Sequence, residues 1–112
     1  MYKRQGVACW DAKYTYWAIR PAQLDPEFQT VIPAPAHPGY PSAHSCLSAA
    51  QAVILGHLFP TAAAQVTTLA DEAGESRIWA GIHFRSDIDA GLALGQDVAE
   101  AVITHAMNDG SQ

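Results

Sequence analysis

Six ionisable side chains in this sequence are spaced so that they could surround a single tetrahedral oxyanion. They occur in three segments, which span residues 13–21, 41–44 and 76–87. The six side chains are those of Lys13, Arg20, His44, Arg77, His83 and Asp87. An oxyanion site needs cations, hydroxyl or amide donors and a proton source, all directed at one point. The three segments contain all of these groups, together with a second histidine that could attack phosphorus.

Lys13 and Arg20 are the first two cations of this set, and they are seven residues apart. Seven residues correspond to almost two turns of α-helix, so both side chains would project from the same face. Two cations on one face repel each other unless an anion lies between them. The alternative is a pair of independent surface cations whose aliphatic stems cover apolar surface. The pair alone is therefore a weak indication of an anion site.

The segment Pro41-Ser42-Ala43-His44 opens an apolar helix. A helix N-terminus offers free backbone N–H groups and a partial positive charge. The hydroxyl of Ser42 and the N–H of Ala43 could both donate to an anion there, and His44 could be a proton donor. The alternative is that Ser42 or Ser45 only caps the helix and that His44 is a structural residue.

His83 and Asp87 are four residues apart, so they share a face if the last helix begins by residue 83. A carboxylate bonded to one ring nitrogen fixes the tautomer and makes the other nitrogen a better nucleophile. Arg77 lies six residues before His83, and a chain reversal at Gly81 would let both face one site. The alternative for the His–Asp spacing is a pair that only stabilises the helix.

The elements that would position these side chains are helices. The apolar pattern and the proline positions predict helices over 6–19, 44–59, 61–74 and 84–108. The helix at 44–59 is apolar on nearly all sides, so it is expected to be buried. Six of the seven prolines lie between residues 21 and 41, which predicts a long ordered loop with one helical turn opening at Asp25. No alternating run is long enough for a strand, and the expected fold class is all-α, a small helical bundle.

Composition limits the remaining possibilities. The length of 112 residues indicates one domain, and the net charge of −5 argues against a nucleic-acid-binding surface. The sequence shows no signal peptide and no transmembrane segment, so a soluble chain in an undetermined compartment is expected. Cys9 and Cys46 are expected to be small core residues rather than a disulfide. The tryptophans are expected in the core or at an interface, and His37 in the loop near the mouth of the site.

The three segments together resemble the signature of the type 2 phosphatidic acid phosphatase (PAP2) and vanadium haloperoxidase superfamily. That signature is Lys, six residues, Arg-Pro; then Pro-Ser-Gly-His; then Ser-Arg, five residues, His, three residues, Asp. Every spacing is met here, and Ala43 stands where the family has glycine. The run AGIHFRSDIDAGLALG, residues 80–95, is similar to the soluble bacterial haloperoxidase-like branch.

The resemblance implies a role for each residue of the signature. The phosphate or vanadate oxygens would be bound by Lys13, Arg20, Arg77, Ser42 and the amide of Ala43. His83 would attack phosphorus, or would ligate vanadium if vanadate is bound, and Asp87 would orient its ring. His44 would protonate the leaving alkoxide and then activate water.

The resemblance leaves three functions open. The first is a metal-independent phosphoesterase of the acid phosphatase type, which acts on a phosphate-containing small molecule through a phosphohistidine intermediate and needs no cofactor. The second is a haloperoxidase that uses bound vanadate, hydrogen peroxide and halide. The third is a truncated, inactive fragment that binds anions without turnover.

Members of the family carry further helices before the lysine-containing one, whereas only twelve residues precede Lys13 here. Residues 1–112 are expected to form a single domain that resembles the C-terminal core of the family bundle. A buried helix at 44–59 needs more neighbours than one short chain supplies, so a homodimer that completes the bundle is expected. Neither a nucleic-acid partner nor a membrane partner is expected.

Overall fold

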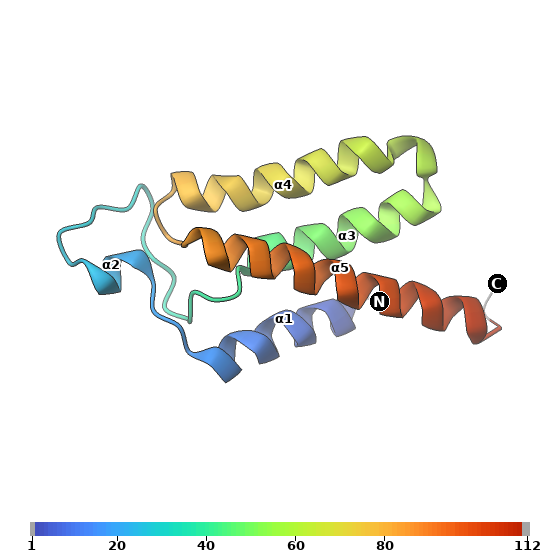
Figure 1. Ribbon diagram of the computed structural model, residues 1–112, viewed down its shortest axis with the longest axis horizontal. Helices are drawn as coiled ribbons and strands as arrows, with labels where there is room; N and C mark the ends of the chain where they lie inside the picture. The colour runs from blue at the N-terminus through green and yellow to red at the C-terminus, as the bar shows by residue number, and fades with distance from the viewer. Residues whose placement is uncertain (1, 111–112) are drawn as a thin grey trace.

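The computed structural model describes residues 2–110, and every regular element in that range is helical (Figure 1). The helices are α1 (Tyr2–Tyr16), α2 (Pro21–Leu24), α3 (Ala43–Leu58), α4 (Ala63–Trp79) and α5 (Arg85–Asn108). A short 3-10 helix, η1 (Pro60–Ala62), joins α3 to α4. The all-α fold class predicted from the sequence is therefore confirmed.

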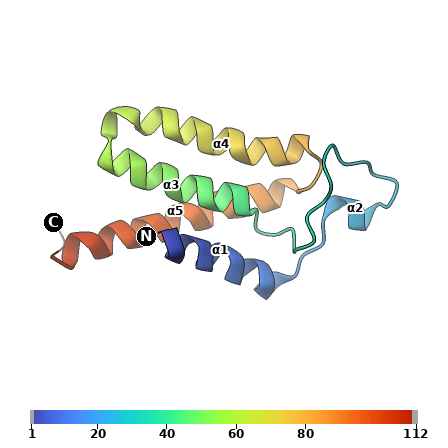
Figure 2. The same ribbon diagram turned by 180° about the vertical axis from the view of Figure 1, so that it is seen from behind.

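Helix α3 lies at the centre of the bundle, where it packs against α1, α4 and α5. Figures 1 and 2 show that α4 runs back along α3 and that α5 then follows the direction of α3. In both views the last turns of α1 and α4 and the first turns of α3 and α5 gather at one end of the molecule. The loop after α2 lies at the same end, so the topology brings the three sequence segments together.

Helix α1 begins and ends earlier than the expected range of 6–19. It ends at Tyr16, and Trp17 leaves the helix with a φ of 50°. Arg20 has an extended backbone and directly precedes α2. The prediction that Lys13 and Arg20 share one helix face was therefore wrong, because the chain turns between them.

Other boundaries also differ from the expected ones, and two of these differences bear on the site. The helical turn in the proline-rich loop is α2, at Pro21–Leu24, rather than a turn at Asp25. Helix α4 continues to Trp79 instead of ending at residue 74, so Arg77 lies in its last turn. Gly81 then has a φ of +74° and begins the reversal that leads to α5. The expected chain reversal at Gly81 is present, and glycine adopts this backbone conformation without steric penalty.

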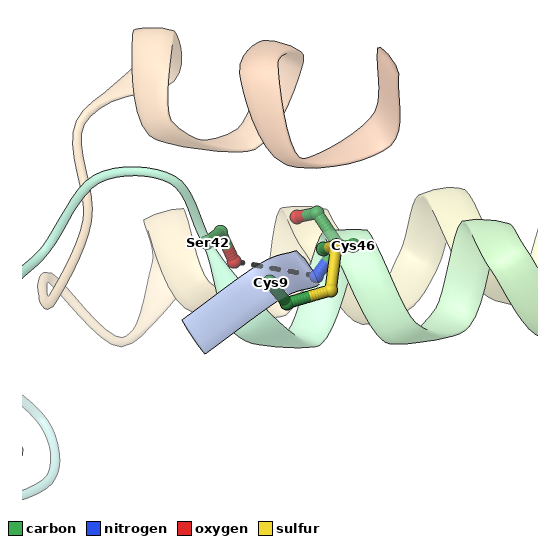
Figure 3. Close-up of a disulfide and its surroundings, with 4 residues drawn as sticks. Cys9, Ser42 and Cys46 are labelled. Carbon is green, nitrogen blue, oxygen red and sulfur yellow. Dashed lines mark hydrogen bonds between the residues drawn. A yellow bond between two sulfur atoms is a disulfide. The ribbon is translucent and has the colours of Figure 1, made fainter. Parts of the chain in front are cut away.

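Cys9 and Cys46 form a disulfide that joins α1 to α3 (Figure 3). Their Cα atoms are 6.2 Å apart, and the side chains are 1% and 0% exposed respectively. The expectation of two unpaired core cysteines was wrong. The two residues are 37 positions apart in the sequence, and only the packing of α1 on α3 brings them together.

Helices α3 and α5 approach each other closely at two glycines of α5. A Cβ on Gly91 would lie 2.6 Å from the carbonyl oxygen of Ser42, and one on Gly95 would overlap the carbonyl oxygen of Cys46. Both contacts involve backbone atoms, which cannot rotate away as a side-chain end can. The α3–α5 interface therefore tolerates only hydrogen at these positions.

We expect Gly95→Ala to lower the free energy of unfolding by about 1–3 kcal/mol, because the helices must separate to admit the methyl group. Gly6 provides the matched control, since a Cβ there would have no neighbour within 4 Å. Gly6→Ala should be neutral or should stabilise α1 by up to about 1 kcal/mol. Urea denaturation of both variants measures the difference, and equal midpoints for Gly95→Ala and the parent would contradict the expectation.

Helix α3 is less completely covered than the sequence suggested. Much of its first half is buried, whereas Leu55 and Leu58 near its end are exposed. Exposed apolar side chains of this kind are typical of surfaces that another element covers. The homodimer remains a prediction, and a single sedimenting species with the mass of one chain at micromolar concentration would contradict it.

No helix within residues 2–110 has both the length and the apolarity needed to cross a bilayer.

Candidate active site

His83 and Asp87 form a buried pair at the start of α5. The Nδ1 atom of His83 lies 2.9 Å from Oδ2 of Asp87, and the two residues are 6% and 2% exposed. The helix begins at Arg85, later than expected, yet the pair still forms because Asp87 reaches back from its first turn. The same carboxylate oxygen accepts a hydrogen bond of 3.0 Å from the N–H of Phe84. Asp87 therefore caps the helix and orients the imidazole at once.

The second ring nitrogen of His83 faces a guanidinium group. Nη1 of Arg20 lies 3.2 Å from Nε2 of His83. Arginine can only donate, so Nε2 must be the acceptor, and the ring proton belongs on Nδ1 next to Asp87. Burial lowers the pKa of His83, an effect that the bond to Asp87 opposes. The ring is thus held neutral, with a lone pair on Nε2.

Arg20 is almost fully buried, with 1% of its surface exposed. Its Nε donates to the carbonyl of His37 at 3.0 Å, and its Nη1 donates to the carbonyl of Ile82 at 2.7 Å. Burial lowers the pKa of Arg20, and the charge of Asp87 opposes that effect. Within residues 2–110 the hydrogen bonds of its guanidinium go to carbonyl oxygens and histidine nitrogens, and none goes to a carboxylate. Its positive charge is therefore not neutralised by direct ion pairing.

Lys13 reaches the same loop from α1. Its Nζ donates to the carbonyls of Pro38 and Gly39, at 2.8 and 3.0 Å, and the residue is fully buried. The pKa of Lys13 is lowered to about 8, mainly by burial and also by the charge of Arg20, while the charge of Asp87 partly opposes both effects. The ammonium group remains mostly charged at neutral pH. Lys13 and Arg20 thus converge on residues 37–39 although they do not share a helix face.

The N-terminus of α3 supplies the next residues of the site. Ser42 is the N-cap, and its hydroxyl accepts a hydrogen bond of 3.3 Å from the N–H of Ser45. The N–H of Ser42 donates to the carbonyl of Asp87 at 2.8 Å, which ties α3 to α5. The capping role considered for Ser42 is therefore present. Ala43 is the first residue of the helix. His44 is the second, and it is exposed to solvent.

Arg77 and His44 lie on the open side of the site. Both line a cleft of about 510 Å³ together with Arg20, Ala43 and His83. Desolvation by the cleft walls lowers the pKa of His44, and the charges of Arg77 and His83 lower it further. The cleft therefore combines three histidines, of which His37 is the third, with two arginines at the end of the bundle where the helix termini meet.

Not every residue of the sequence signature lines this cleft. Arg20, Ala43, His44, Arg77 and His83 line it. Asp87 lies behind His83, and Lys13 and Ser42 are buried beside the cleft, where their polar atoms contact backbone groups. The predicted site residues thus lie close together. Five of them line the cleft, and Lys13, Ser42 and Asp87 lie behind or beside it.

Trp10 and His37 are among the residues of the cleft that the sequence signature does not contain. Trp10 was expected in the core or at an interface, but it is 37% exposed and lines the cleft from α1. His37 lies at the cleft, as expected, and its Nδ1 is 3.3 Å from Nη2 of Arg20. The available sequence signal was the position of Trp10 three residues before Lys13, which places both on adjoining turns of one helix.

The chain matches the family model of the PAP2 superfamily over residues 4–109. Non-specific acid phosphatases from Salmonella typhi and Salmonella typhimurium are 38% and 36% identical to it over 56 residues. Those residues make up 50% of this chain and 22% of each phosphatase, so the match spans about a fifth of the relatives' length.

Two solved structures share the arrangement of helices. A bacterial vanadium-dependent iodoperoxidase superposes with a TM-score of 0.80 at 30% identity, over 89% of this chain and 30% of that one. A transmembrane PAP2-type phosphatidylglycerolphosphate phosphatase from Bacillus subtilis superposes with a TM-score of 0.74 at 18% identity, over 96% of this chain and 56% of that one. The family model, the helical fold and the gathered signature agree, and the chain belongs to the PAP2 superfamily.

Proposed function

We propose that this protein is a metal-independent phosphomonoesterase that works through a phosphohistidine intermediate. The observation that carries the proposal is the state of His83: Nδ1 is bonded to Asp87 at 2.9 Å, while Nε2 holds a lone pair beside the guanidinium of Arg20 at 3.2 Å. A neutral imidazole with one nitrogen oriented by a carboxylate is an activated nucleophile. The adjacent cation would attract the phosphate that this nucleophile attacks.

In the first step, Nε2 of His83 would attack phosphorus, and the bond from phosphorus to the ester oxygen would break. Arg20 and Arg77 would bind the equatorial oxygens, whose charge develops during the transfer. A phosphate oxygen would replace Nε2 as the acceptor for Arg20. His44, on the open side of the cleft, would give its proton to the leaving alkoxide.

In the second step, His44 would take a proton from water, and the resulting hydroxide would attack phosphorus. The bond from phosphorus to Nε2 would break, which releases inorganic phosphate and restores the neutral ring of His83. The buried charge of Lys13 lies near enough to lower the pKa values of His44 and His83, so it also adds to the positive potential of the site.

Vanadate-dependent halide oxidation is the second candidate, and the likeness to the iodoperoxidase at 30% identity favours it. The residues fit this cofactor, because Nε2 of His83 carries an unprotonated lone pair, which here accepts from Arg20, and Arg20 places a positive charge beside it. His83 would ligate vanadium, and Arg20 and Arg77 would hold the vanadate oxygens. Bound vanadate would supply the activation of hydrogen peroxide for halide oxidation.

One pair of assays separates the candidates. Hydrolysis of p-nitrophenyl phosphate is measured beside bromide and iodide oxidation in the presence of vanadate and hydrogen peroxide. We expect hydrolysis without added metal or vanadate, and turnover only in the second assay would overturn the phosphatase proposal. Absence of turnover in both, with inorganic phosphate still raising the melting temperature, would favour an inactive anion-binding domain.

The proposed mechanism predicts an activity optimum on the acid side of neutrality. It requires His44 protonated and His83 neutral, and both pKa values are lowered, first by burial and then by the nearby cations. Activity should fall as pH rises through the lowered pKa of His44, and it should fall again in stronger acid as His83 gains a proton.

The pH dependence of kcat for p-nitrophenyl phosphate measures this optimum. Arg77→Gln removes the charge that contributes most, after burial, to the lowered pKa of His44. Its alkaline limb should therefore move to higher pH, even though its maximal rate falls. An optimum on the alkaline side of neutrality in the parent would contradict the assignment of His44 as the acid.

A further inference from the structure

The cleft has more lining residues than the oxyanion site uses. From α3 it is lined by His44, Leu47 and Gln51, which are spaced by about one helical turn each. Trp10 from α1 and Ile32 from the proline-rich loop also line it. The phosphatase proposal assigns no role to Trp10, Ile32 or Leu47, which are the large apolar residues of this lining.

Trp10 is held in a fixed orientation at the apolar end. Its ring contacts the edge of His37, with centroids 4.7 Å apart, and it stacks on Tyr14 at 6.2 Å with an interplanar angle of 24°. The ammonium group of Lys13 lies 5.9 Å from the centre of the indole ring. A ring that three neighbours already hold loses little further freedom when a ligand packs on it.

The aromatic wall is continuous with the proposed nucleophile. Trp10 contacts His37, whose Nδ1 lies 3.3 Å from Nη2 of Arg20, and Nη1 of Arg20 lies 3.2 Å from Nε2 of His83. All four side chains line the same cleft, so a group attached to a phosphate at His83 shares that cleft with the indole. His37 lies at the junction between the two parts of the cleft.

The charges of the lining residues also limit which substrates fit the cleft. None of the described residues that line it is acidic, so no carboxylate is available for an ammonium group on the substrate. Burial lowers the pKa of His37, which keeps its ring neutral near pH 7. The walls around Trp10 therefore favour a flat, apolar group over a cationic one.

We infer that the preferred substrates are monoesters of neutral aromatic alcohols, with the aromatic group packed on Trp10. This inference rests on the proposed phosphatase function, and it names Trp10 as a specificity-determining residue. The alcohol portion would lie along α3 between the indole and Leu47. Sugar phosphates and short alkyl phosphates would leave the apolar part of the cleft empty.

The disulfide lies beside two residues of the cleft. Cys9 directly precedes Trp10, and Cys46 directly precedes Leu47, so the bond links α1 to α3 next to both residues (Figure 3). Both half-cystines are buried. A covalent link therefore restrains the two helices at the positions from which Trp10 and Leu47 line the cleft.

The test compares 2-naphthyl phosphate with ethyl phosphate in the parent, Trp10→Ala and Trp10→Leu. We expect the kcat/KM for 2-naphthyl phosphate to fall about tenfold in both variants, while that for ethyl phosphate stays within about twofold. Trp10→Leu retains apolar volume, so it keeps the test decisive if Trp10→Ala does not fold. Trp79→Ala is the matched control, because Trp79 is 80% exposed and does not line the cleft, and both rates should be unchanged in it.

A parallel binding measurement tests the aromatic subsite at Trp10 separately from the phosphatase activity. Naphthylmethylphosphonate and methylphosphonate carry the same anion but cannot be hydrolysed, and we expect the first to bind about tenfold more tightly to the parent only. If neither ester is hydrolysed but this difference is present, the phosphatase proposal fails and the aromatic subsite stands. Equal affinities of the parent for the two phosphonates would contradict the proposed subsite. Equal losses of kcat/KM for both esters in the Trp10 variants would contradict it as well.

Discussion

Replacing His83 with alanine is expected to lower the turnover of a phosphate monoester by about a thousandfold or more while the fold is retained. The substitution removes the only atom proposed to bond to phosphorus, and no other described side chain has the same geometry. Nε2 of His83 lies 3.2 Å from Arg20, and its ring is oriented by Asp87. The remaining cations would still bind phosphate, so the loss should appear in kcat more than in KM.

The measurement combines steady-state hydrolysis of p-nitrophenyl phosphate with acid-labile labelling of the protein by radioactive phosphate. His57→Ala is the matched control, because His57 is an exposed residue near the end of α3. It should keep full activity and labelling. Circular dichroism checks that His83→Ala remains helical, and full activity in that variant would show that another group attacks phosphorus.

Asp87→Asn should give a smaller but measurable loss. An amide cannot supply the negative charge that stabilises the cationic ring of the phosphohistidine, which forms in the first step, and its N–H groups can favour the wrong tautomer. Asp87 also accepts the N–H of Phe84, so this variant should lose some stability as well. Comparing the two substitutions separates the nucleophile from the residue that positions it.

The sequence identified the residues of the site better than it identified how the chain positions them. The spacings within the three segments predicted that histidines and arginines meet, and the structure places them around one cleft. The helix boundaries near Lys13 and Arg20 were wrong, because the left-handed backbone at Trp17 has no local signal in a non-glycine residue. Both cations still converge, since the carbonyls of the proline-rich loop bind each of them.

The supporting positions of Lys13 and Ser42 could not be inferred from spacing either. A motif fixes residue types and distances along the chain, whereas burial depends on which elements cover the residue. Lys13 is covered because α1 packs on α3 and α5 beneath the loop at 37–39. The disulfide depends on the same packing, and two cysteines 37 residues apart carry no local sign of their pairing.

Reduction of the Cys9–Cys46 disulfide is expected to lower the free energy of unfolding by about 4 kcal/mol. The bond closes a loop with a sequence separation of 37 residues, and the entropy that such a loop removes from the unfolded chain gives a figure of this size as an upper value. That loss is a large share of the stability of a small domain. Guanidinium denaturation with and without dithiothreitol measures it, and a Cys9→Ala, Cys46→Ala variant should be insensitive to the reductant.

The expected loss is not confined to stability, because α1 carries two residues that serve the site. Lys13 lies about one turn after Cys9, and its ammonium group binds the loop at 37–39. Trp10 directly follows Cys9 in the sequence and lines the cleft. When the bond is reduced, α1 is held on α3 and α5 by packing alone. Hydrolysis of 2-naphthyl phosphate should therefore decline at denaturant concentrations at which the oxidised protein is fully active. Identical unfolding midpoints with and without reductant would show that packing, rather than the covalent link, holds α1 in place.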